Sequence, residues 1–170
     1  MKAVKASAIA LALAGVLATS ACAGTTSAET AAVVEGRVIT EQQVREATDQ
    51  INTAFTPDQP LTAAQTLTLL IRAPYINEAA AAAGKAQSES AARAALVDFP
   101  EEPLDTTVEI LQAEASLQQL EGAPEARQAL VDKIADLEVT VSPRYGTFDP
   151  ARAEIVVSRP NWIDSATDEN

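Results

Sequence analysis

The chain has 170 residues, one cysteine, no histidine, and 24 acidic against 12 basic side chains, which gives a formal net charge of −12. This length suits a single domain. The acidic balance disfavours nucleic acid and anionic lipid head groups as partners. Without histidine the chain cannot form a Ser-His-Asp triad, and a lone cysteine cannot form an internal disulfide or a cysteine-based zinc site. We therefore expect no enzyme activity, no metal, no cofactor and no small-molecule substrate.

The beginning of the chain predicts an export signal. Two lysines precede an uncharged apolar run, Ala6–Ala18, which is too short for a transmembrane helix. The stretch Leu17–Cys22 (LATSAC) resembles a bacterial lipoprotein box, so residues 1–21 are predicted to be a lipoprotein signal peptide and Cys22 the lipidated residue. The protein is then anchored by lipid on the extracytoplasmic face of the cell membrane. In the alternatives, signal peptidase cleaves after Ala23 and the protein is secreted, or Cys22 stays a free thiol.

The rest of the chain divides into a tether, one domain and a tail. Residues 22–31 are small and polar and are predicted to form a flexible tether. The domain is predicted to span residues 32–163, with Trp162 and Ile163 packing as its last apolar pair. Residues 164–170 are predicted to be disordered.

A strand followed at once by a helix opens the predicted domain. Ala32–Ile39 is rich in β-branched residues and predicts a short strand with a bend or bulge at Gly36. Thr40 and Gln43 have the spacing of a capping box, which predicts a helix over residues 41–55.

The next predicted helix carries the densest apolar cluster of the domain and is expected to be its centre. A second capping box, Thr62 with Gln65, predicts its beginning, and Gly84 predicts its end. Pro74 predicts either a kink in this helix or the start of a new one.

Three further helices are expected before the chain returns to strands. A short one is capped by Ser88 or Ser90, a longer one covers Leu104–Glu121, and the last begins at Pro124. The predicted inward residues are Leu104, Val108, Leu111 and Ala115 on the second of these helices and Ala126, Leu130, Ile134 and Leu137 on the third.

Two segments near the end alternate apolar and polar residues and predict strands. These are Glu138–Val141 and Ala153–Val157, separated by a turn-rich connection over residues 142–150. A short strand needs a partner, so both segments are expected to pair with the first strand. The predicted fold class is mainly α, with about five helices and a small β-sheet formed by N-terminal and C-terminal strands.

This order of elements resembles the N-terminal chaperone domain of SurA and of PrsA-type exported peptidyl-prolyl isomerases. The resemblance rests on the strand and helix start at Val33–Thr40, the core helix in Leu61–Gly84, the serine-capped helix, and the strand after Leu137. The stretch Val139–Asp149 contains Pro-Arg-Tyr-Gly, which is similar to small actinobacterial SurA N-terminal-domain lipoproteins. No parvulin-like domain follows it in this sequence.

The resemblance implies a lipid-anchored, holdase-like module that binds unfolded or newly exported polypeptides without isomerase activity. The alternative is a non-catalytic scaffold lipoprotein that binds one specific envelope partner. Arg144 and Tyr145 are candidate partner contacts, because an arginine fork beside a tyrosine suits a carboxylate with apolar neighbours. In a structural alternative, Tyr145 packs under the turn and Arg144 bonds to carbonyls or an acid. The acidic group of Asp98, Glu101 and Glu102 is expected to be a solvated loop.

Overall fold

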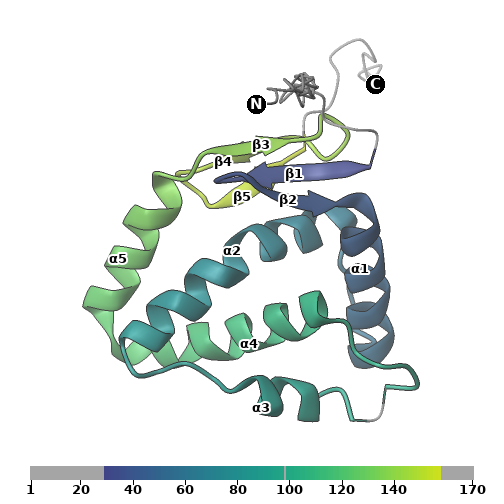
Figure 1. The fold of residues 1–170 in the computed structure, drawn as a ribbon, viewed down its shortest axis with the longest axis horizontal. Coiled ribbons are helices and arrows are strands. Elements are labelled where there is room, and N and C mark those ends of the chain that lie inside the picture. Colours follow the sequence, from purple (N-terminus) through teal and green to yellow (C-terminus); the bar gives the residue numbers. More distant parts are fainter. Residues whose placement is uncertain (1–28, 98, 158–170) are drawn as a thin grey trace, which may run out of the picture.

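Helices lie beneath a small antiparallel sheet in the computed structural model, which describes residues 29–97 and 99–157 (Figure 1). This part of the chain is mainly helical, and its strands come from the N-terminal and C-terminal regions, so the predicted fold class is confirmed. The helices are α1 (Glu41–Phe55), α2 (Ala63–Ala82), α3 (Glu89–Ala94), α4 (Asp105–Gln119) and α5 (Pro124–Ala135), with a 3₁₀ turn η1 (Leu120–Gly122). The strands are β1 (Thr30–Val34), β2 (Arg37–Thr40), β3 (Val139–Val141), β4 (Thr147–Asp149) and β5 (Glu154–Val156).

The first predicted strand is in fact a hairpin. β1 and β2 pair antiparallel, with Val34 opposite Arg37, so Glu35 and Gly36 form a two-residue turn and not a bulge within one strand. Both turn residues have positive φ, 49° and 81°, as the tight turns that suit hairpin twist require. β1 begins at Thr30, so the last two residues of the predicted tether belong to the sheet.

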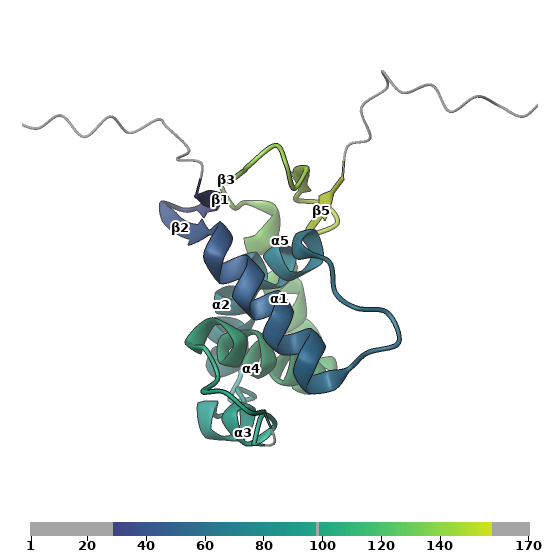
Figure 2. The same cartoon turned by 90° about the vertical axis from the view of Figure 1, so that its right-hand side faces the viewer.

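The two ends of the domain meet in the sheet, but only one of the two late segments pairs with the first strand. β3 pairs antiparallel with β1, with Val33 opposite Thr140, as expected, which gives the strand order β2-β1-β3. β5 pairs instead with β4, which lies inside the stretch predicted as a turn-rich connection. Figure 2 shows this second hairpin beside the first sheet, above the helices. The prediction that 153–157 joins the first strand was therefore wrong.

The predicted helix signals agree closely with the structure. Thr40 and Thr62 each form a complete capping box with the glutamine three residues later, at the beginnings of α1 and α2. Gly84, at φ 66°, ends α2: its N–H donates to Ala81 O and the N–H of Lys85 donates to Ala80 O. This double hydrogen bond is a Schellman motif, which satisfies carbonyls that the helix end leaves free. Ser88 caps α3.

Pro74 lies inside α2 without ending the helix. A proline has no N–H, so the carbonyl of Leu70 loses its helical donor. Arg37 of β2 replaces it: its Nη2 donates to Leu70 O at 3.1 Å. The N-terminal hairpin thus supplies the hydrogen bond that the proline removes from the central helix.

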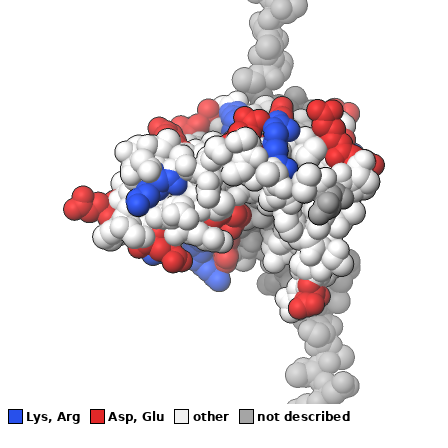
Figure 3. Space-filling model, turned by 90° about the horizontal axis from the view of Figure 1, so that it is seen from below, with Lys and Arg blue, Asp and Glu red and all other residues white. Residues whose placement is uncertain are grey.

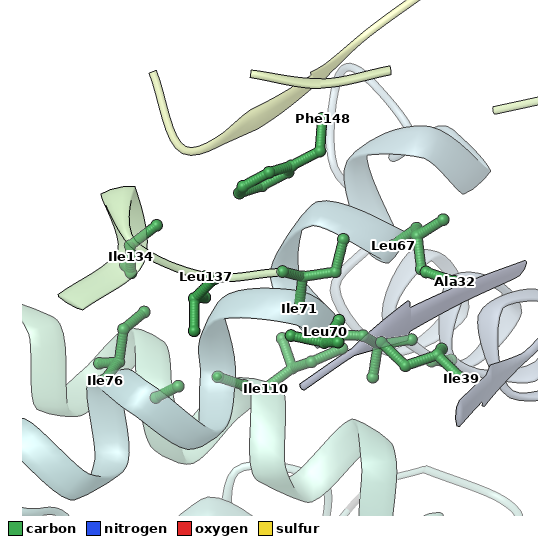
Figure 4. Close-up of a cluster of buried hydrophobic side chains, with 14 of the residues drawn as sticks. Ala32, Ile39, Leu67, Leu70, Ile71, Ile76, Ile110, Ile134, Leu137 and Phe148 are labelled. Carbon is green, nitrogen blue, oxygen red and sulfur yellow. The ribbon is translucent and has the colours of Figure 1, made fainter. Parts of the chain in front are cut away.

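The core is built around α2, with the sheet on one side and α4 and α5 on the others (Figure 4). Leu67, Leu70 and Ile71 are at most 1% exposed. Ile39 and Ile110 approach from β2 and α4, as the labelled side chains in Figure 4 show. The same cluster contains Ala31 and Phe148, so side chains from near both ends of the described residues share one core.

The inward face of α4 differs from the predicted stripe, whereas that of α5 agrees with it. On α4 the buried residues are Thr107, Val108, Ile110, Ala113 and Ser116. Only Val108 of the predicted set is among them, because α4 packs against both α2 and α3 and so buries two faces. On α5, Leu130 and Ile134 are buried as predicted.

Several predictions fall outside the described residues. They concern Cys22 with the signal peptide, Trp162 and Ile163, and the tail 164–170. Among residues 29–97 and 99–157, no helix has the length and hydropathy needed to cross a membrane.

Candidate functional site

Two hollows lie end to end along one side of α2. The first, about 400 Å³, lies among α2, α4, α5 and the connection between β4 and β5. The second, about 510 Å³, lies between α2 and β5. Arg72 and Arg152 line both hollows, so the two adjoin at these side chains. We call the combined surface the α2 groove.

Apolar side chains make up just over half of the lining of the α2 groove, and polar and charged side chains make up the rest. The apolar side chains are Leu117, Leu130, Val131, Ile134, Pro150, Ala151 and Ala153 in the first hollow and Leu61, Ala64, Leu69, Ile155 and Val157 in the second. Val131 and Val157 are 57% and 61% exposed. Large apolar side chains exposed along a hollow favour a binding surface over an ordinary solvated face.

The β4–β5 hairpin forms one wall of the groove and is held to the rest of the domain by two kinds of contact. The hydroxyl of Thr68 accepts a hydrogen bond from the N–H of Ile155 at 3.1 Å and donates to Ala64 O at 3.0 Å. Phe148 of β4 points into the core beside Ile134 and Leu137 (Figure 4) and is 9% exposed. The hairpin is therefore anchored by its own core residue.

Among the described residues that line the groove, Arg72 is the one side chain with a buried polar atom that lacks a hydrogen-bond partner. Its Nε is buried and makes no hydrogen bond, and the guanidinium forms no ion pair with any described residue. Arg152, in contrast, contacts Glu154 at 2.9 Å. A buried polar group without a hydrogen-bond partner destabilises the folded protein. An arginine at such a position therefore indicates ligand binding more than a structural role.

A second polar cluster lies under the hairpin of β1 and β2, away from the groove. Burial raises the pKa of the Glu109 carboxyl, while the charge of Arg37 acts in the opposite direction. Burial also raises the pKa of Tyr75, whose ring lies 5.8 Å from the ammonium of Lys133. Asn77 donates to Glu109 O at 3.3 Å. These contacts join α2 to α4, and none of these residues lines the α2 groove, although Asn77 Oδ1 is buried without a hydrogen-bond partner.

The predicted partner contacts, Arg144 and Tyr145, lie together near the start of α1. Arg144 pairs with the carboxylate of Glu41 at 2.6 Å, and Tyr145 packs against the core. Burial raises the pKa of the Tyr145 hydroxyl, with Glu41 adding to the shift. Both residues already have partners within the domain, as the structural alternative proposed. Neither lines the α2 groove.

Charge and metal chemistry give no further site in the described part of the chain. No group of three or more acidic or cysteine side chains in residues 29–97 and 99–157 has the geometry to hold a metal ion. On the face shown in Figure 3, basic side chains are separated by acidic and uncharged surface. Comparison of the chain with protein-family models, curated proteins and solved structures gives no match in any of the three.

Sequence reasoning missed the α2 groove and its arginine, although one signal was present. Arg72 follows three apolar residues, Leu69, Leu70 and Ile71, in the densest apolar cluster of the domain. A charged residue there needs a partner or a function. The groove itself could not be predicted, because it depends on how β5 packs against α2.

Proposed function

We propose that this protein is an extracytoplasmic holdase that binds unfolded or newly exported polypeptides in the α2 groove, without isomerase activity. The observation that carries the proposal is the groove itself, whose lining combines apolar side chains, with an exposed valine on each hollow, and charged ones. Unfolded chains present apolar side chains in no fixed geometry, so they suit an adaptable apolar surface that needs no directional chemistry. The order of elements, similar to the SurA N-terminal domain, supports the same role.

A titration against an aggregating client tests this proposal. Purified protein is added to a chemically unfolded exported protein, from substoichiometric amounts to excess, and aggregation is followed by light scattering. We expect suppression that saturates near stoichiometric ratios, because one groove holds one chain. No suppression at excess, together with recovery of a single envelope partner in pull-downs, would favour the scaffold alternative.

We further propose that acyl chains on Cys22 hold the domain on the outer face of the membrane. The motivation is the lipoprotein-like sequence before Cys22 and a net charge that anionic lipids repel, so attachment must come from the acyl chains. We expect Cys22→Ser to move the protein from the membrane fraction to the soluble fraction, measured by immunoblotting of both. Unchanged membrane partitioning would rule out the lipid anchor.

A further inference from the structure

Arg72 differs from the other basic side chains that the structure describes because its Nε is buried without a hydrogen-bond partner. The chain carries twice as many acidic as basic side chains, yet Arg72 pairs with none of them in the part the structure describes. Glu114 and Glu121 line the same hollow and form no ion pair with it. Arg127 and Arg152 also line this hollow and Glu154 lines the adjoining one, so the groove holds three arginines and three glutamates, with Arg152 paired to Glu154. What suits an anionic group is therefore Arg72 itself, whose buried Nε has no hydrogen-bond partner, and not the net charge of the groove.

The position of Arg72 within the groove limits what that group belongs to. Arg72 lines both hollows, with apolar walls continuing on either side of it. A polypeptide that fills both hollows therefore places an interior residue, and not a chain end, beside the guanidinium of Arg72. The planar guanidinium binds a carboxylate through two parallel hydrogen bonds, which a neutral amide cannot reproduce.

We propose that Arg72 binds the side-chain carboxylate of an aspartate or glutamate in the middle of an extended polypeptide, whose flanking apolar side chains fill the two hollows. This inference rests on the proposed function and specifies the chemistry of the segment that binds. The groove then binds segments with an acidic residue between apolar ones more tightly than other apolar segments. The buried Nε without a partner is then the half of a hydrogen-bonded pair that the polypeptide completes.

Fluorescence anisotropy with three labelled nine-residue peptides tests the inference on purified protein. The peptides have apolar flanks and carry a central glutamate, the same glutamate moved to one end, or a central glutamine. The first two have equal composition and net charge, so long-range repulsion from the acidic protein affects both alike. We expect the central-glutamate peptide to bind about tenfold more tightly than either of the others, as expected for a charge-assisted hydrogen bond.

Two substitutions assign the effect to Arg72. Arg72→Gln is expected to abolish the tenfold preference and to leave the affinity for the central-glutamine peptide within about twofold. Arg45→Gln is the matched control, because Arg45 is an exposed arginine on α1 that does not line the groove. It is expected to retain the preference. The melting temperature of Arg72→Gln should not fall, because Arg72 has no partner to lose.

The outcomes separate this inference from the proposed function. Equal binding of all three peptides by a protein that still suppresses aggregation overturns the role of Arg72 and leaves the holdase in place. If the protein neither binds the peptides nor suppresses aggregation, the role of Arg72 and the holdase function are both overturned. Binding of the central-glutamate peptide only after removal of the residues beyond Val157 would assign the groove to this chain's own segment and overturn the proposal of an external polypeptide.

Discussion

Gly146→Ala is expected to lower the free energy of unfolding by about 2–4 kcal/mol. Two causes add at this position. Gly146 has φ 118°, a conformation that residues with a side chain rarely adopt, and an added Cβ would lie 2.2 Å from Val156 O. The oxygen belongs to the backbone of β5 and cannot rotate away. The β4–β5 hairpin must therefore shift, which exposes Phe148 and removes one wall of the α2 groove.

Gly84→Ala is the matched control for this prediction. Gly84 also has positive φ, 66°, but an added Cβ there meets no atom within 4 Å. Its cost should be confined to backbone strain, about 1 kcal/mol. Urea denaturation of both variants measures the difference. Equal losses for the two variants would show that the contact between Gly146 and β5 does not hold the hairpin in place.

Arg37→Met should destabilise the domain by about 1–2 kcal/mol, because it leaves the carbonyl of Leu70 without a donor. Methionine keeps much of the apolar stem and removes the guanidinium. This cost depends on Pro74, because its missing N–H leaves the carbonyl of Leu70 without a donor from the helix. In a Pro74→Ala background the helix supplies its own N–H, and the cost of Arg37→Met should fall to about 0.5 kcal/mol or less.

A double-mutant cycle measured by urea denaturation decides this prediction. Arg45→Met controls for the loss of an exposed arginine and should change the free energy of unfolding by less than about 0.5 kcal/mol. If Arg37→Met lowers the free energy of unfolding equally with and without Pro74, the hydrogen bond from Arg37 to Leu70 O does not compensate for the N–H that the proline lacks.

Local signals predicted the helices well because their causes lie within a few residues. Both capping boxes join a threonine to a glutamine three residues away, and the Schellman motif at Gly84 involves only the end of α2. Pro74 is the informative exception. Its helix continues because Arg37, far away in the sequence, satisfies Leu70 O, and no local pattern contains that contact.

Strand pairing was harder to predict because partners are chosen by tertiary packing. The residues around Gly36 predict a bend or bulge within one strand, although glutamate followed by glycine between β-branched residues also suits a hairpin turn. β4 has three residues in a stretch rich in turn formers, so its pattern is too short to detect. β4 pairs with β5, and the N–H of Ile155 in β5 donates a hydrogen bond to the hydroxyl of Thr68 on α2. These two contacts place β5 along the groove.

The sequence and the structure point to different candidate sites. Arg144 and Tyr145 attracted attention because their residue types suit a partner, but each has a partner inside the domain. Arg72 has the same chemistry and no partner, a difference that appears only when the neighbours in space are known. The residue type shows which side chains could bind a partner. Only the structure shows which of them lacks a partner inside the domain.

Mapping a bound polypeptide by NMR tests whether unfolded chains bind in the α2 groove. Isotope-labelled protein is titrated with a permanently unfolded polypeptide, and changes in amide resonances are assigned along the chain. We predict that the changes gather on Leu61–Arg72, on α5 and on β5, which line the α2 groove. Changes confined to α1 and the Arg144–Tyr145 turn, or no change at saturating polypeptide, would contradict the assignment of the groove as the binding site.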